Sequence, residues 1–456
     1  MARTFLRDIV EAPAVVLGKT VDITKNIVRR IKGQKEIKDA KEYWKSLGPG
    51  LTTGAADDDP SGVATYSQAG AGFGFNLLWT AVFTFPFMSV VQEMCARIGL
   101  VTGRGLAANI RIHYPKWVLY TCTFLLFGAN SLNIGADLGA MAKAVQLIYP
   151  KISFDFLILA IAIFSLALQI FTTYDKYAKY LKYLALVLLA YVFSALIANL
   201  DFNQILMKAF IPTLTFSKDE IFIITAILGT TISPYLFFWQ TSQEVEEQIM
   251  GGMTTLKLRQ AETTNKEIKD MRVDVWSGMF LSNLVMFFII AACGGVLYAH
   301  GITNITSAEQ AAEALRPLAG DAAYLLFALG ILGTGLLTIP VLAGSASYAL
   351  SECFGWKYGL YRKLKEANAF YGVIIIATLV GLGINFLNID TFKVLLYTAV
   401  GNALISPIIL FLIVRLSSSK KVMGNRTNHP VTNFLGWLIT GIMFVAGSAT
   451  LLSFFV

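Results

Sequence analysis

Residues 55–64 read AADDDPSGVA, so three consecutive aspartates and a proline interrupt a stretch that is otherwise small and apolar. The flanking residues, LGPGLTTG (47–54) and TYSQAGAGFGFNLLWT (65–80), contain no lysine or arginine that could pair with them. A carboxylate at bilayer depth is costly unless it is paired or solvated, so it marks a functional site. Proline removes a backbone donor and clashes with the preceding helical turn. The stretch therefore predicts a helix that unwinds near Pro60 and presents carboxylates at the break.

The composition of the chain indicates a membrane protein. Of its 456 residues, 55% are apolar and 14% are charged, and the mean hydropathy is +0.61. A soluble domain carries about 25% charged residues. The four cysteines stand apart from one another and the three histidines lie at segment ends, so we expect neither a disulfide framework nor a histidine-built metal site. The sequence has no nucleophile–base pair, HExxH motif or nucleotide-binding loop, so we do not expect an enzyme.

Apolar segments of about 20 residues are long enough to cross a bilayer. Eleven are predicted, at about 48–71, 76–96, 117–147, 153–172, 181–199, 219–245, 273–299, 320–350, 370–388, 393–414 and 432–455. Residues 1–47 are basic and lack the features of a signal peptide, so we expect them to form a cytoplasmic N-terminal segment. Residues 48–455 are predicted to form a single transmembrane transporter domain.

Lysine and arginine are distributed unevenly between the two sides of the predicted segments. The N-terminal stretch and every second loop hold 31 of the 37. Because cytoplasmic loops are enriched in these residues, we expect a multi-pass protein of the cell membrane, or bacterial inner membrane, with a cytoplasmic N-terminus. The C-terminus is then extracellular or periplasmic. The net charge of +8 reflects topology and contact with the lipid bilayer, and no nucleic-acid partner is expected.

A second break is predicted in the sixth segment, IFIITAILGTTISPYLFFWQ (221–240), where Gly-Thr-Thr precedes Ser-Pro. Paired interrupted helices at corresponding positions of two halves are typical of transporters built from an inverted repeat. We therefore predict an all-α fold with five-helix repeats at about 48–199 and 219–414, and an extra helix at 432–455. Irregular backbone is tolerated in a membrane where it lines a cavity, so both breaks should face one central site.

The residue types at the two breaks favour a hard cation. The first break offers carboxylates, and the second offers hydroxyls and freed carbonyl groups, at Thr230, Thr231, Ser233 and Tyr235. An all-oxygen environment suits Mg²⁺, Mn²⁺ or Ca²⁺. Asp59, directly before the proline, is the expected ligand, followed by Asp58 and then Asp57, because three successive helical residues cannot all point at one ion. The alternative for the others is capping a helix or facing water.

A second polar stripe lies in the third segment, where Asn130, Asn133 and Asp137 share one helical face. Asp137 either serves a proton or water route or pairs with Lys143 or an arginine, and the sequence leaves both open. Asn133 and Gln240 are assigned with Asp137 to a polar pathway. The acidic residues within 243–247 are predicted to form a solvated helix end. Glu93 is expected to have a partner that the sequence does not identify.

Four stretches carry a resemblance to a known family: GPGLTTGAADDDPSG, ARIGLVTGRGLA (96–107), NIGADLG and LGTTISPYLFFWQ. Together they resemble the natural resistance-associated macrophage protein (Nramp) family of divalent-metal transporters. The resemblance implies a LeuT-like fold of five plus five inverted helices with the first and sixth broken. It also implies a cytoplasmic N-terminus and a metal site between these two helices.

The resemblance implies specific roles at the breaks and also shows departures from the family pattern. The family aspartate is kept as Asp59, and the implied carbonyl donors are Ala56 and Thr230. Gly62 stands where the family has asparagine, and the other departures are Ser233 for methionine, Tyr235 for histidine and Ala140 for glutamate. This combination looks like the divergent branch of Nramp-related magnesium transporters.

We therefore expect a monomeric secondary transporter that moves Mg²⁺, and also Mn²⁺, into the cytoplasm as a partly hydrated ion without proton coupling. No cofactor is expected. One alternative is a proton-coupled Mn²⁺/Fe²⁺ transporter. Another is an organic-solute symporter of the same fold, whose carboxylate-bearing substrates the three aspartates would repel. A receptor would need a larger extramembrane domain than the 47 N-terminal residues.

Overall fold

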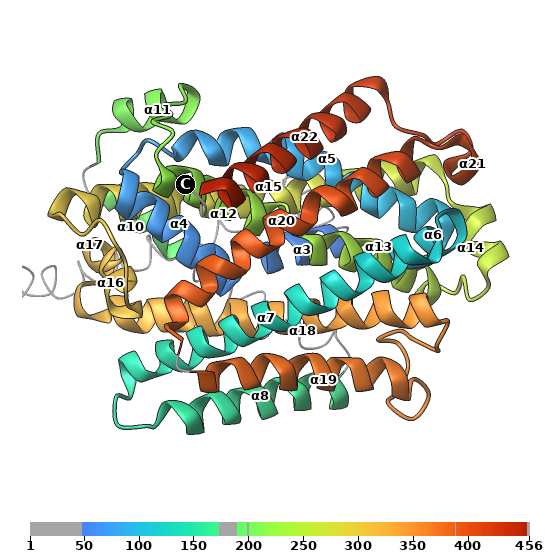
Figure 1. The fold of residues 1–456 in the computed structure, drawn as a ribbon, viewed down its shortest axis with the longest axis horizontal. Coiled ribbons are helices and arrows are strands. Elements are labelled where there is room, and N and C mark those ends of the chain that lie inside the picture. Colours follow the sequence, from blue (N-terminus) through green and yellow to red (C-terminus); the bar gives the residue numbers. More distant parts are fainter. Residues whose placement is uncertain (1–47, 173–188, 198–199, 388, 454–456) are drawn as a thin grey trace, which may run out of the picture. The chain divides into compact units, whose positions relative to one another are not determined.

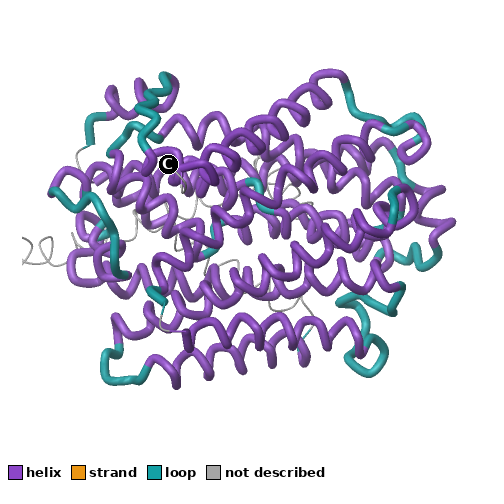
Figure 2. The backbone as a smooth tube through the Cα atoms, in the orientation of Figure 1, coloured by secondary structure: helices purple, strands orange, loops and turns teal. Residues whose placement is uncertain are grey.

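The computed structural model describes residues 48–172, 189–197, 200–387 and 389–453. The described residues from Pro49 onward form one compact unit. The predicted N-terminal segment and most of the predicted fifth transmembrane segment lie outside the described residues. All regular structure within these ranges is helical (Figure 2).

Long helices, together with the short helices α3 and α10, occupy the predicted segments. Their bounds are α3 (Pro49–Asp57), α4 (Pro60–Phe73), α5 (Leu78–Thr102), α7 (Lys116–Ile148), α8 (Phe154–Phe171), α10 (Ala190–Ile197), α12 (Lys218–Thr231), α13 (Pro234–Met250), α15 (Asn265–Val296), α18 (Ala323–Phe354), α19 (Asn368–Ile384), α20 (Thr391–Ser418) and α22 (Pro430–Ser453). Shorter helices lie between them: α6 (Leu106–His113), α11 (Phe202–Phe210), α14 (Leu256–Glu262), α16 (Ala308–Glu313), α17 (Arg316–Ala319) and α21 (Lys420–Met423). In the described part of the chain, eight helices, with α12 and α13 taken as one, are long and apolar enough to cross a bilayer.

The helices of the compact unit fall into two packed groups (Figure 1). In the first, which we call the α15 group, α15 packs against α3, α4 and α5, and α13 packs against α5. In the second, the α7 group, α7 packs along α18, and α8 and α19 lie beyond this pair. We name the two ends of the unit after α6, on the right in Figure 1, and α16, on the left.

Much of the surface between the two ends is apolar. Large hydrophobic side chains are exposed on α8, for example Ile163 and Phe164, and on α22, for example Phe434 and Phe444. Exposed apolar surface of this extent marks contact with a membrane or a partner. With helices of this length, the surface is that of a protein embedded in a bilayer.

Both predicted breaks are present at their prolines. The helix α3 ends at Asp57 and α4 begins at Pro60, which is favourable at the first helical position because its missing N–H would have no partner there. The helix α12 ends at Thr231 and α13 begins at Pro234. Glycine allows α3 to lie close against α15: a Cβ on Gly54 would lie 2.2 Å from the carbonyl oxygen of Gly278.

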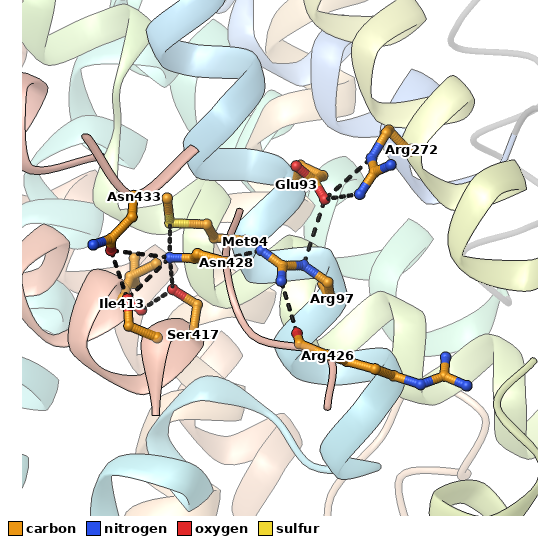
Figure 3. A network of polar contacts seen from close by, with 10 residues as sticks. Glu93, Met94, Arg97, Arg272, Ile413, Ser417, Arg426, Asn428 and Asn433 are labelled. Carbon is orange, nitrogen blue, oxygen red and sulfur yellow. Dashed lines mark hydrogen bonds and ion pairs between the residues drawn. The ribbon is translucent and has the colours of Figure 1, made fainter. Parts of the chain in front are cut away.

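A buried ionic network ties three parts of the fold together at the α6 end (Figure 3). Glu93 on α5 pairs with Arg97 at 3.4 Å and with Arg272 on α15 at 3.0 Å. Arg97 also donates to the carbonyl oxygen of Arg426 at 2.8 Å and to Oδ1 of Asn428 at 2.5 Å. These contacts identify the partner of Glu93 and hold the linker between α21 and α22 against α5.

Candidate functional site

Asp59 lies in the first break, directly before α4. Its side chain is 1% exposed and caps α4 by accepting from the backbone N–H of Gly62 at 2.6 Å. It also accepts from Ser61 Oγ at 2.8 Å and from Asn133 Nδ2 on α7 at 3.0 Å. The carboxylate therefore lies between the break and the α7 group.

The carbonyl oxygen of Ala56, in the last turn of α3, connects the first break to the second. It accepts from the hydroxyl of Tyr235 at 3.0 Å and from Thr338 Oγ1 on α18 at 3.1 Å. Tyr235 directly follows the proline of the second break, so the two broken helices face each other as the sequence predicts.

Gly62 and Thr230 lie on either side of the same space. A Cβ on Gly62 would lie 3.2 Å from Thr230 Oγ1 and 3.3 Å from both Asp59 Oδ1 and the carbonyl oxygen of Asp57. Thr230 Oγ1 is buried without a hydrogen-bond partner among the described residues. A side chain at position 62 would therefore be in tight contact with three oxygen atoms, which glycine avoids.

Ser233 uses its hydroxyl proton within the second break. Its hydroxyl donates back to the carbonyl oxygens of Gly229 at 2.6 Å and Thr230 at 2.8 Å, at the end of the preceding helix α12. These carbonyls lack the next helical turn, so the serine satisfies acceptors that the break leaves free.

The three aspartates of the break contact two different helices. Ser282 on α15 donates to Asp57 Oδ2 at 2.6 Å and is 3.3 Å from Asp58 Oδ1. Asp59 instead contacts α7 through Asn133. Asp58 therefore lies on the α15 side of the break, with Asp57, and not beside Asn133.

Asp137 lies on α7, one helical turn from Asn133, and interacts electrostatically with Asp59. It is fully buried, and neither of its carboxylate oxygens has a hydrogen-bond partner within the described ranges. Lys143 does not pair with it, because its ammonium lies over the ring of Phe154 at 5.0 Å from the centroid. Pairing with Lys143 is therefore wrong, and no arginine of the described residues forms an ion pair with Asp137 either, which leaves a proton or water route as its predicted role.

The two breaks and α7 thus bury four carboxylates, those of Asp57, Asp58, Asp59 and Asp137. The ion pairs found in the described part of the chain involve Glu93 and Glu313, and none involves these four. Buried charge without a counter-charge is unfavourable, so these groups must be neutralised by protons or by a cation. No three His, Cys, Asp or Glu side chains of the described residues could hold a metal together. A cation here would combine a carboxylate with carbonyl and hydroxyl oxygens and water.

A cavity of about 230 Å³ leads from the first break toward the α16 end. Pro60 and Ala140 line it near the break, and Lys143, Glu309 and Asp390 are the charged residues in its lining. The site is therefore bordered by a cavity on the side of the α16 end.

Gln240 lies further along α13, on a row of hydrogen bonds that runs toward the α6 end. Its Oε1 accepts from Thr53 Oγ1 on α3 at 2.5 Å, and its Nε2 donates to Glu244 Oε1 at 2.9 Å. It connects α3 with the end of α13 and does not contact Asp59 or Asp137 through these bonds.

The prediction of a solvated helix end at residues 243–247 is wrong for Glu244 and Glu246, which are each 4% exposed. Glu246 accepts from the hydroxyl of Tyr348 on α18 at 2.6 Å and from the backbone N–H groups of Leu360 at 2.8 Å and Tyr361 at 3.1 Å. The end of α13 is buried because α18 and the loop after it cover it. These bonds close the α6 end between the two helix groups.

Three residues that contact the site were missed from the sequence: Ser61, Ser282 and Thr338. Ser282 and Asn283 are adjacent polar residues in the middle of the apolar span MFLSNLVMFF, a signal that could have been read as functional. Thr338 lies in a span with several other small polar residues, so nothing distinguishes it locally.

Comparison with known proteins places the chain in a family. A family model described as natural resistance-associated macrophage protein-like matches residues 50–453. A protein named divalent metal cation transporter MntH from Aeromonas hydrophila is 26% identical over 403 residues, which cover 87% of this chain and 93% of that protein. One of the same name from Yersinia pestis is 27% identical over 443 residues, covering 94% and 97%.

Solved structures share the fold. The manganese transporter of Eremococcus coleocola superposes with a TM-score of 0.70 at 18% identity, covering 89% of this chain and 86% of that chain. MhsT in complex with L-phenylalanine superposes with a TM-score of 0.52 at 12% identity, covering 90% and 98%. The prediction of an all-helical, multi-span fold of the LeuT type is confirmed. From the match of the family model over nearly the whole described chain, the protein belongs to the Nramp family of membrane transporters and is not an enzyme.

Proposed function

We propose that the protein carries a divalent metal cation across the membrane, with Mg²⁺ as the main substrate and Mn²⁺ as a second. The observation that supports this most directly is the group of four buried carboxylates at the helix breaks, which no basic residue of the described chain neutralises. The relatives named divalent metal cation transporter and manganese transporter support the cation class.

The donor set that we assign to the ion carries oxygen and no sulfur. It consists of the Asp59 carboxylate, the carbonyl oxygens of Ala56 and Thr230, and the hydroxyl of Tyr235, with Asp58 on the α15 side and Gly62 bordering the space. Ser233, the residue before α13, is assigned because its hydroxyl oxygen lies 2.8 Å from the carbonyl oxygen of Thr230 and keeps lone pairs for a cation. Oxygen ligands suit Mg²⁺, which usually keeps several waters, and the absence of a thioether removes a preference for softer ions.

We propose that transport is uncoupled from protons. Tyr235 and Ala140 stand where the family pattern has titratable histidine and glutamate, and Asp137 remains beside Asp59. The membrane potential supplies about 2.3 kcal/mol per elementary charge per 100 mV, and roughly twice that for a divalent ion. The alternative, proton-coupled Mn²⁺ transport, is favoured by the unpartnered carboxylate of Asp137.

We propose that the α6 end faces the cytoplasm. The loops and helix ends that lie there hold 17 of the 37 lysines and arginines, and residues 1–47 hold another 11. Three more lysines, within residues 173–182, come directly after α8 in the sequence. Cytoplasmic loops are enriched in lysine and arginine. The cavity that reaches Pro60 then opens outward, and the C-terminus lies outside. Residues 48–199 and 219–414 form the two repeats, 432–455 adds a helix, and the functional unit is a monomer.

The proposal is tested by Mg²⁺ uptake into proteoliposomes. Asp59→Ala should abolish saturable uptake, because the carboxylate that faces both breaks is lost. Glu366→Gln, a change at an exposed acid in the loop between α18 and α19, is the matched control and should transport normally. Normal uptake by folded Asp59→Ala would refute the site, and a Mg²⁺-dependent fall in the pH of a trapped dye would refute uncoupled transport.

A further inference from the structure

Tyr66 lies on α4, one helical turn after Gly62. It is fully buried, in the half-helix that begins at Pro60. Residues four apart share one face of a helix, and a long side chain there points back toward the N-terminus of the helix. The phenol of Tyr66 is therefore directed toward the first break, over a position at which Gly62 has no side chain.

The neighbours of this phenol agree with that direction. It interacts with the hydroxyl of Thr230 and with the carboxylates of the three aspartates at 57–59. The phenol of Tyr235, at the second break, interacts electrostatically with Tyr66 as well. Tyr66 thus lies among the groups that we assign to the ion.

The hydroxyl of Tyr66 is left unsatisfied in these surroundings. Its contact with Thr230 Oγ1 does not have the geometry of a hydrogen bond, and neither atom has another partner among the described residues. The hydroxyl of Tyr235, in contrast, donates to the carbonyl oxygen of Ala56 at 3.0 Å. A buried tyrosine hydroxyl normally has a hydrogen-bond partner. Two unpaired hydroxyls beside carboxylates therefore indicate a bound ion or its waters.

We propose that Tyr66 is a specificity-determining residue of the transport site, and that its phenolic oxygen holds the ion through one of the ion's waters. The inference rests on the divalent-cation function and the site proposed above. The lone pairs of a phenol accept a hydrogen bond from a metal-bound water, and its O–H donates to a carboxylate. From one turn further along α4, Tyr66 then supplies the polar group that Gly62 lacks.

A contact through water favours an ion that keeps its waters. Mg²⁺ dehydrates reluctantly and usually retains several waters when it binds a protein. Mn²⁺ is larger and gives up its waters more readily, so it gains less from a group that acts only through them. The phenol of Tyr66 therefore contributes more to the binding of Mg²⁺ than to the binding of Mn²⁺, and it shifts the ion ranking toward Mg²⁺.

The binding test is calorimetric titration of the full-length protein with Mg²⁺ and with Mn²⁺. Tyr66→Phe removes the phenolic oxygen and keeps the ring. The Kd for Mg²⁺ should rise about tenfold or more, because a hydrogen bond to the hydrated ion is lost, and the Kd for Mn²⁺ should rise by a clearly smaller factor. If the phenylalanine variant is unstable, Tyr66→Leu, which also lacks the oxygen, should shift the ion ranking in the same direction.

The matched control is Tyr191→Phe. Tyr191 lies on α10, is 1% exposed, and its hydroxyl also has no hydrogen-bond partner within the described ranges. It interacts with Ser67 and Cys293. Tyr191→Phe removes the same atom from an equally buried tyrosine away from the breaks, and it should bind both ions as the native protein does.

The transport test measures the competition of Mg²⁺ and Mn²⁺ for uptake into proteoliposomes. The preference for Mg²⁺ should fall in Tyr66→Phe and stay unchanged in Tyr191→Phe. A purely structural role of Tyr66 would weaken both ions alike, so equal losses for Mg²⁺ and Mn²⁺, or no loss in the folded variant, would overturn the inference. Asp59→Ala tests the function on which it rests: this variant should bind neither ion, and native-like binding by it would overturn the proposed site instead.

Discussion

Glu246 offers the sharpest test of how the α6 end is closed. It lies on α13 in the α15 group, while its partners Tyr348, Leu360 and Tyr361 belong to α18 and the loop that follows it. Glu246→Gln keeps the size of the side chain and removes its charge. The glutamine oxygen can still accept from Tyr348 or Leu360, but its amide nitrogen would face the N–H of Tyr361, so that two donors oppose each other.

The magnitude follows from these three bonds. Hydrogen bonds to a charged group contribute about 1.5–3 kcal/mol each, and leaving a buried N–H unsatisfied costs about 1–3 kcal/mol. We expect the closed arrangement to lose about 2–4 kcal/mol, which shifts its equilibrium with an open form by at least about tenfold.

The assay places a reporter cysteine at Ser242, which lines the cavity between α13 and α18 that Glu246 also lines. Ser242 is 3% exposed and its hydroxyl has no hydrogen-bond partner among the described residues, so Ser242→Cys is mild. The four native cysteines are buried and should give little background. Alkylation of Ser242→Cys by a small maleimide should accelerate at least about tenfold when Glu246→Gln is added.

The control for this prediction is Tyr348→Phe, which removes one of the three donors and should accelerate alkylation less. When Tyr348→Phe is added to Glu246→Gln, the further increase in alkylation rate should be smaller than the increase that Tyr348→Phe causes by itself, because the two residues share one hydrogen bond. Unchanged alkylation and an unchanged unfolding temperature in folded Glu246→Gln would show that this carboxylate does not hold the end closed.

Three further outcomes are expected. Glu93→Ala leaves the guanidinium of Arg97, which is 4% exposed, without its carboxylate partner. It should lower the free energy of unfolding by about 3 kcal/mol, measured by denaturation in detergent. An unchanged free energy of unfolding would contradict the role of the network in Figure 3. Gly62→Asn with Ser233→Met adds an amide and a thioether to the space at the breaks, so competition assays should show Mg²⁺ losing most, Mn²⁺ losing less and Cd²⁺ gaining; an unchanged ion ranking would mean that these positions do not set selectivity. Asp137→Asn should leave the proton independence of Mg²⁺ uptake unchanged in a trapped-dye assay, and a proton flux that only the native protein shows would support the coupled alternative.

The sequence by itself determined the helices and their breaks, because these depend on neighbours along the chain. Apolar runs of bilayer length predict where helices cross. Proline by itself does not decide a break, because Pro86, Pro340 and Pro407 lie inside α5, α18 and α20. Pro60 follows three aspartates, and Pro234 follows a Gly-Thr-Thr-Ile-Ser stretch, so the breaks at Asp59 and Ser233 are predicted by proline together with the poor helix formers before it. Asp59 as the residue that caps the second half-helix is likewise a consequence of its place directly before proline.

The directions of the charged side chains were decided only by the tertiary structure. Asp57 forms a hydrogen bond with Ser282, which is 225 residues away in sequence, and Asp59 forms one with Asn133, which is 74 residues away. Adjacent aspartates therefore contact different helix groups. The local sequence predicts that Glu246 lies at a solvated helix end. In the structure it is buried and bonded to Tyr348, which is 102 residues away in sequence. Hydropathy and proline act through the local backbone, whereas burial and pairing of a charge depend on which distant helix packs against it, and no local pattern carries that information.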